Sequence, residues 1–138
     1  MSVYSSTIEI STKGFTDIID ITEDVQNVVK ESGIKDGIVN IFCIGSTGGI
    51  TTVEYEPGLV RDLKDFFEDI IPYDKDYSHH NTWHDNNGAG HLRSSLVGPS
   101  LTVPVSAGAL VLGTWQQIIF IDFDTRARKR KIMVQVLC

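Results

Sequence analysis

The sequence has few cysteines, no long apolar run and a shortage of positive charge. Two cysteines among 138 residues do not make a disulfide framework, and they suit a reducing cytoplasm. No apolar run approaches the roughly 18 residues of a membrane span, and the N-terminus lacks the segments of a signal peptide. The formal charge of −6 is opposite to the bias of a nucleic-acid binder. We therefore expect a cytoplasmic protein with neither a membrane nor a nucleic acid as its partner.

The composition is that of a folded domain. Hydrophobic residues make up 41% of the chain, charged residues 22%, and the mean hydropathy is −0.01. Disorder and fibrous repeats are excluded by these values. The length suits one domain over residues 1–138, and no linker or internal repeat divides it.

Apolar periodicity predicts an α+β fold. Helices are expected over 22–32 and over 58–71, where apolar residues that include Leu63 and Phe67 recur at helical spacing before Pro72. A third, short helix is predicted over 91–97. Strands are expected over 3–10, 15–21, 38–44, 50–55, 101–105, 110–112, 115–123 and 132–137. The short connections favour a largely antiparallel sheet with the two main helices packed on it. The run 38–44 is almost wholly apolar, which predicts a strand covered on both faces. Apolar content on both faces of 101–137 also suggests a contact between subunits.

All four histidines lie between His79 and His91, in a polar segment that also holds Asp85. Imidazole and carboxylate suit zinc and other divalent ions, so His79, His80 and His91 are candidate metal ligands. Adjacent side chains in an extended segment point to opposite sides, which leaves open whether His79 or His80 faces the site. The alternative is a polar surface loop.

Two further segments are candidates for anion binding. The corner Gly45-Ser46-Thr47-Gly48-Gly49 offers backbone N–H groups and the hydroxyls of Ser46 and Thr47, although a plain turn would use the same residues. The basic stretch over 126–131 contains Arg126, Arg128 and Arg130. It is either an exposed strand edge protected by its charge or a phosphate clamp.

Three other residues have an open interpretation. Asp85 and Glu54 are the candidate catalytic carboxylates, although the solvated face of a strand also explains Glu54. Trp115 is expected in the core or in an interface.

Several strings together are similar to one known family. They are HLRSSLVGPS over 91–100, VPV over 103–105, LGTWQQI over 112–118, GST over 45–47, ITT over 50–52, EPG over 56–58, and DFD over 122–124 before the arginines. On these strings the chain resembles the YjbQ family over nearly its whole length. The resemblance implies a compact α+β fold, a homotrimer, a metal held by histidines near residue 79 and at His91, and weak thiamine-phosphate synthase activity.

The chain departs from the family pattern at two places. Where many members carry His-x-His, this sequence reads Ala89-Gly90-His91, and where many carry His-Thr-Thr it reads Gly45-Ser46-Thr47. Two ligands of the family type are therefore missing. Either His80, His84 or Asp85 replaces them, or this chain holds a metal weakly or not at all.

Two functions are consistent with these residues. The first is an enzyme of small phosphorylated molecules, with a divalent metal on the histidines, Arg126, Arg128 and Arg130 on a phosphate, and Ser46 and Thr47 on another phosphate oxygen. The second is a non-catalytic oligomeric module that binds a metal or a small ligand at the same residues.

Overall fold

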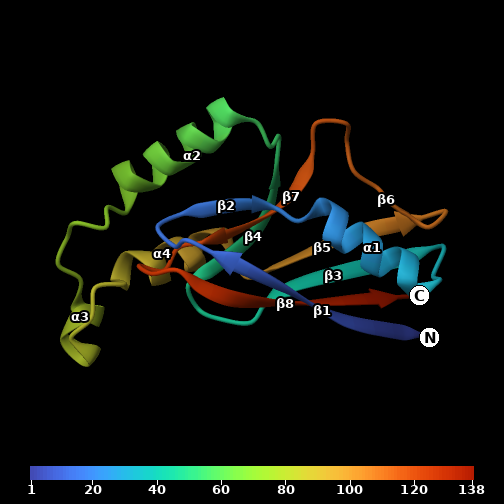
Figure 1. Cartoon of the computed structure of the whole chain (residues 1–138), viewed down its shortest axis with the longest axis horizontal. Helices are drawn as coiled ribbons and strands as arrows, with labels where there is room; N and C mark the ends of the chain where they lie inside the picture. Colours follow the sequence, from blue (N-terminus) through green and yellow to red (C-terminus); the bar gives the residue numbers. More distant parts are fainter.

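The computed structural model describes residues 1–138 and arranges them as two antiparallel sheets with four helices (Figure 1). The elements are β1 (Val3–Thr12), β2 (Asp17–Asp20), α1 (Thr22–Ser32), β3 (Gly37–Cys43), β4 (Gly48–Val53), α2 (Pro57–Ile70), α3 (Ser78–Trp83), α4 (Gly88–Val97), β5 (Ser100–Ser106), β6 (Ala109–Leu110), β7 (Gln117–Asp122) and β8 (Arg128–Leu137). The predicted α+β class is confirmed, and the predicted third helix is α4. Helix α3 was not predicted.

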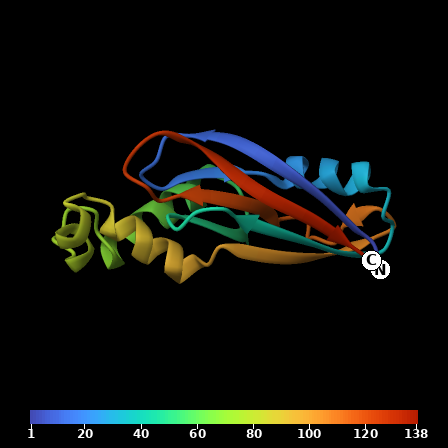
Figure 2. The same cartoon turned by 90° about the horizontal axis from the view of Figure 1, so that it is seen from below.

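The larger sheet has the strand order β1-β8-β3-β5-β6, and the smaller has β2-β7-β4. Every neighbouring pair is antiparallel. Residues Ser2 and Cys138 exchange two backbone hydrogen bonds of 3.2 Å. The two ends of the chain therefore lie side by side at one end of the molecule, and α3 lies at the other end (Figures 1 and 2).

The main core lies between the two sheets and is closed on one side by α1. Strands contribute alternate residues to it because successive side chains of a strand point to opposite faces. Its buried members are Ile21, Val25, Val28, Val29, Val39, Ile41, Cys43, Ile50, Val103, Val105, Ile118, Phe120, Ile132, Val134 and Val136. Burial raises the pKa of the Cys43 thiol, as suits a residue that packs as a small hydrophobe.

Helix α2 covers the other face of the smaller sheet. The Glu56 carboxylate accepts hydrogen bonds from the first-turn N–H groups of the helix, and Pro57 occupies its first turn. Phe67 is buried and lies edge-on to Phe123, with 5.0 Å between the ring centroids. Phe67 is thus as predicted, whereas Leu63 is only half-buried.

Two interpretations of the sequence are wrong. The basic stretch is not a strand edge, because β8 lies between β1 and β3. Strand β3 is covered on one face only, since Ile38 and Phe42 are exposed.

Trp115 was expected in the core or in an interface. It is not in the core of the chain, because 73% of its surface is exposed, and the interface stays a prediction.

No helix has both the length and the apolar character that a bilayer crossing requires.

Strand β7 explains much of the apolar content that suggested a subunit contact. Its alternate residues pack into the main core on one side and toward α2 on the other. The strand is therefore buried on both faces within one chain, and its composition needs no partner subunit.

Candidate functional site

Seven of the ten predicted site residues line one pocket of about 460 Å³. The pocket lies where the loops after β3, α3 and β7 meet the start of α4 and of β8. Its lining contains no hydrophobic residue and consists of Gly45, Ser46, Thr47, Asp85, Asn86, Asn87, His91, Asp124, Thr125, Arg126, Arg128 and Arg130. Predicted residues from four separate segments are thus brought together by the fold.

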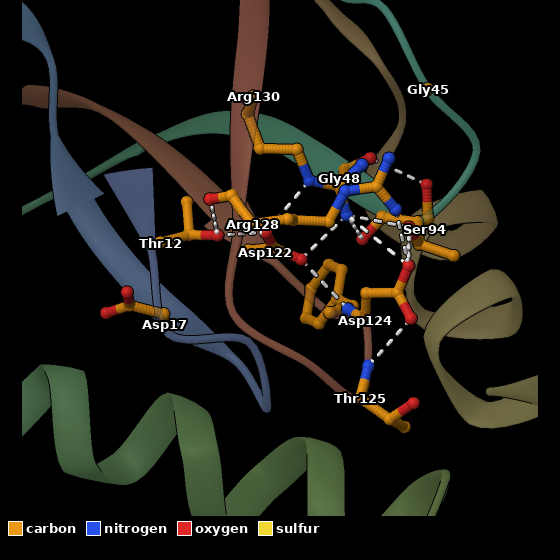
Figure 3. A network of polar contacts seen from close by, with 12 residues as sticks. Thr12, Asp17, Gly45, Gly48, Ser94, Asp122, Asp124, Thr125, Arg128 and Arg130 are labelled. Atoms are coloured by element: carbon orange, nitrogen blue, oxygen red, sulfur yellow. Dashed lines mark hydrogen bonds and ion pairs between the residues drawn. The ribbon is translucent and has the colours of Figure 1, made fainter. Parts of the chain in front are cut away.

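The floor of the pocket is a buried ion pair between Arg130 and Asp122 (Figure 3). Arg130 Nε lies 2.8 Å from Asp122 Oδ2 and Arg130 Nη2 lies 2.7 Å from Oδ1. The Thr12 hydroxyl donates to the same carboxylate. Burial alone would raise the pKa of Asp122, but the hydrogen bonds from Arg130 and Thr12 hold it below its ordinary value. The carboxylate is therefore charged and holds the guanidinium in one orientation.

A second carboxylate, Asp124, organises the wall of the pocket. Its Oδ2 accepts from Thr47 Oγ1 at 3.0 Å and from Arg128 Nη1 at 2.8 Å, and its Oδ1 accepts from the backbone N–H of Thr125 at 2.7 Å. Burial opposes the charge, but these donors lower the pKa of Asp124. Thr47 also accepts from Arg130 Nη2 at 2.7 Å, so its hydroxyl serves the network.

Several donors of the pocket have no partner within the chain. Arg126 and Ser46 are exposed, and neither side chain makes a hydrogen bond or an ion pair. Arg130 Nη1 makes no hydrogen bond and lies beside Gly45, where a Cβ atom would come within 2.9 Å of it. Arg128 uses only Nη1 on Asp124. The pocket therefore presents guanidinium N–H groups and a hydroxyl to a ligand.

The glycine corner contributes less to the pocket than the sequence suggested. Gly48 and Gly49 are buried against neighbouring side chains. A Cβ atom on Gly48 would come within 2.8 Å of Phe120, and one on Gly49 would come equally close to Val97. The carbonyl of Gly48 accepts from the Ser94 hydroxyl at 2.6 Å, which ties α4 to this loop. These two glycines permit close packing, and only Gly45 of the three lines the pocket.

The histidine segment separates into a pair with adjacent rings, of which His91 lines the pocket, and two residues with other contacts. The rings of His79 and His91 lie 4.3 Å apart, and His79 Nε2 lies 3.8 Å from Asp85 Oδ2. Burial, with a smaller contribution from His79, lowers the pKa of His91 and favours its neutral form. His80 Nε2 accepts the backbone N–H of Gly88 at 2.9 Å. His84 is exposed and ends α3 with φ of 56°. His79, rather than His80, is therefore the partner of His91.

Comparison with known proteins places the chain in a family. The profile described as "UPF0047 protein YjbQ-like" matches residues 6–138. A UPF0047 protein of Methanothermobacter thermautotrophicus is 41% identical over 136 residues, which cover 99% of this chain and 93% of that protein. The chain belongs to the YjbQ-like UPF0047 family.

Further relatives match in sequence and in structure. YugU of Bacillus subtilis is 38% identical over 119 residues, which cover 86% of this chain and 88% of that protein. A crystal structure of a YbjQ-like protein of unknown function from Sulfolobus solfataricus has a TM-score of 0.91 at 35% identity, and covers 98% of this chain and 96% of that one.

The two departures from the YjbQ-like pattern differ in their surroundings. Ala89 is fully buried in α4 and lines no pocket, so a histidine there has no open path to the site. Gly45 lines the pocket, next to Arg130 Nη1. No group of three or more histidine, cysteine, aspartate or glutamate side chains in the chain converges in a metal-holding arrangement.

Glu54 is not brought to this pocket within one chain. It follows β4 at the end remote from Gly48, about 20 Å away at the rise of a strand. No single motif of the sequence marks Thr12, Asp122 or Asp124 as functional residues.

The two aspartates belong to a pattern that would have indicated them. Charged residues stand at every second position of one segment, namely Asp122, Asp124, Arg126, Arg128 and Arg130.

Proposed function

We propose that the chain binds a small phosphorylated molecule in this pocket and acts on it as an enzyme. The observation that carries the proposal is the convergence of Arg126, Arg128 and Arg130 on a pocket without a hydrophobic lining residue. Guanidinium groups bind phosphate through paired N–H donors. Some arginine N–H groups are already used on Asp124 and Asp122. A phosphate would accept hydrogen bonds from the remaining ones.

The charge balance of the pocket supports a ligand with several negative charges only if a cation accompanies it. Three arginines line the pocket. They are balanced by the lining carboxylates Asp85 and Asp124 and by Asp122, the buried partner of Arg130, so the formal charge is zero when His91 is neutral. The negative charge of pyrophosphate therefore exceeds what these side chains neutralise. A divalent cation bound next to the arginines would supply the remainder.

His79, His91 and Asp85 have the chemistry to hold such a cation. Two imidazoles and a carboxylate suit zinc, and the three groups are neighbours. No three of these groups converge in a metal-holding arrangement, so a cation bound here would need further ligands from water and from the substrate phosphate. His80 would have to release Gly88 to take part through Nε2. The cation would neutralise charge on the phosphate groups that the arginines bind.

The finer proposal is thiamine-phosphate synthase chemistry, which rests on the resemblance to the family. A carbon–nitrogen bond forms between a pyrimidine pyrophosphate and a thiazole phosphate, and pyrophosphate leaves with the electron pair of the broken carbon–oxygen bond. Arg126, Arg128 and Arg130 would stabilise the leaving group, and Ser46 would donate to a phosphate oxygen. Such donors act most strongly where charge develops.

A non-catalytic binding module is the second candidate, and the positions of the carboxylates favour it. Glu54 lies at the remote end of β4, and the side chain of Asp85 is 36% exposed. A ligand-binding protein needs the arginines and no proton-transfer group. The two candidates share the binding pocket and differ in turnover.

Calorimetric titration with pyrophosphate, with and without Zn²⁺ or Mg²⁺, tests the proposed binding. Arg126→Ala is expected to weaken binding by about ten-fold or more, because a charge-assisted hydrogen bond is lost. Lys129→Ala is the matched control, since it removes the same charge from the same segment at a position 76% exposed and outside the pocket. Equal losses in the two variants, or no binding by the parent protein, would contradict the proposal.

The role of the histidines is tested separately. His91→Ala is expected to abolish the part of pyrophosphate binding that depends on the cation, and His84→Asn is expected to leave it unchanged. Asparagine tolerates the left-handed backbone of residue 84. Assay of thiamine phosphate formation from the two phosphorylated precursors then separates the candidates, since binding without turnover favours the module.

A further inference from the structure

A second pocket adjoins the first at His91. It has a volume of about 430 Å³ and is lined by Tyr77, Ser78, His79, Gly88, His91 and Leu92. His91 lines both pockets, and His79, whose ring centroid is 4.3 Å from that of His91, lines only the second. His91 is thus the side chain that the two compartments share.

The two compartments differ in chemistry. Asp85, Asp124 and three arginines line the first, whereas the second contains no aspartate, glutamate, lysine or arginine. Its walls are the Tyr77 and Leu92 side chains, the imidazoles and the Gly88 backbone. The Lys75 ammonium lies 5.3 Å from the centroid of the Tyr77 ring but does not line the pocket. The volume of the second compartment is within the range of small-molecule sites, so it has room for a single ring with its substituents.

Gly88 and Tyr77 fix the shape of this compartment, and Leu92 gives it an apolar side chain. A Cβ on Gly88 would come within 2.7 Å of Tyr77 Cβ and 2.9 Å of His80 Nε2, so only glycine permits the approach of α3 to α4. Tyr77 is fixed by a hydrogen bond of 2.6 Å from its hydroxyl to the Pro72 carbonyl. Leu92 remains 48% exposed at the compartment, although it is a large apolar side chain.

We propose that the second compartment binds an uncharged ring of the same ligand whose phosphate is bound by the arginines. The ligand class is therefore a phosphate ester with an uncharged ring, and the ligand extends past His91, which lines both pockets. This inference rests on the proposed function, because it needs the phosphate in the first pocket. Burial of roughly 60 Å² of apolar ring surface corresponds to an affinity gain of about ten-fold.

The test compares calorimetric titrations of inorganic phosphate, methyl phosphate and phenyl phosphate. Phenyl phosphate is expected to bind about ten-fold more tightly than methyl phosphate. Leu92→Ser is expected to remove most of this preference without changing the affinity for inorganic phosphate. Leu96→Ser is the matched control, because Leu96 is 59% exposed on the same helix, one turn further on, and lines neither pocket.

The outcomes distinguish the two proposals. If none of the three phosphates binds, the proposed function fails, and this inference fails with it. If all three bind with equal affinity, the proposed function stands and the ring compartment is refuted. A preference for phenyl phosphate that survives Leu92→Ser, or that Leu96→Ser removes equally, also refutes it, because the ring then binds elsewhere.

Discussion

Replacement of Arg130 by methionine is expected to destabilise the protein strongly. Arg130 is 2% exposed and Asp122 is 0% exposed, and two hydrogen bonds of 2.7 and 2.8 Å join them. Without the guanidinium, Asp122 keeps only the Thr12 hydroxyl and the backbone N–H of Asp124 as donors. A buried charge that loses its partner costs about 3–5 kcal/mol. Arg130→Met should therefore lower the free energy of unfolding by that amount.

Urea denaturation followed by circular dichroism measures this loss. With a slope of about 2 kcal/mol per molar urea, a loss of about 4 kcal/mol lowers the midpoint by about 2 M. The double variant Arg130→Met/Asp122→Asn should recover at least half of the loss, because both buried charges are then absent. Lys129→Met should cost about 0.5 kcal/mol or less, since Lys129 is exposed and lies 3.7 Å from its partner Glu9.

Two results would refute this reasoning about the buried pair. One is a single variant that loses less than about 1 kcal/mol, which would show that water reaches Asp122. The other is a double variant as unstable as the single one. That result would mean that packing of the arginine side chain, rather than its charge, stabilises the fold.

Four further results are expected. Because the pKa of Asp122 is lower in the folded chain than its ordinary value of about 4, its stabilisation is present above that pH and is lost as the pH falls below it; urea midpoints from pH 7 to pH 3 measure this decline, and a flat profile would contradict it. Phe67→Ala should cost about 3–5 kcal/mol and Phe66→Ala about 1 kcal/mol or less, because the first side chain is 4% exposed and the second 53%; equal urea-denaturation losses would exclude this packing of α2. Gly88→Ala should weaken binding of phenyl phosphate, since the added methyl group displaces α3, and an unchanged titration would show that the loop adjusts. Light scattering at low micromolar concentration should give three times 15.3 kDa, as the family resemblance implies, and a monomer mass would overturn the trimer.

Local patterns predicted the elements well where one physical signal dominated. The spacing of apolar residues and Pro72 fixed α2 to within a residue at each end, because amphipathic periodicity and proline both act locally. The hairpin at Ser106-Ala107-Gly108 was also predictable from its turn residues. Helix α3 was not predictable, because five of its six residues are polar and Trp83 alone makes no apolar face.

The site was predictable as a set of residue types but not as an arrangement. The sequence marked Arg128 and Arg130 as equivalent cations, yet the first is 35% exposed at the pocket and the second is buried on Asp122. That difference depends on where β8 lies in the sheet, which is a long-range property. The choice between His79 and His80 similarly depends on α3, because the contact of His80 with Gly88 connects residues eight positions apart.

The position of β8 has a consequence for how the chain folds. This strand follows all others in the sequence, yet it lies inside the larger sheet between β1 and β3, and its partner β1 is more than a hundred residues earlier. Contacts between distant segments slow folding, because the loop must close before the contact is gained. A nascent chain that lacks β8 leaves β1 without a partner strand, whereas β3 can still pair with β5. It also lacks Arg128 and Arg130, so the addition of β8 completes the larger sheet and the pocket in the same step.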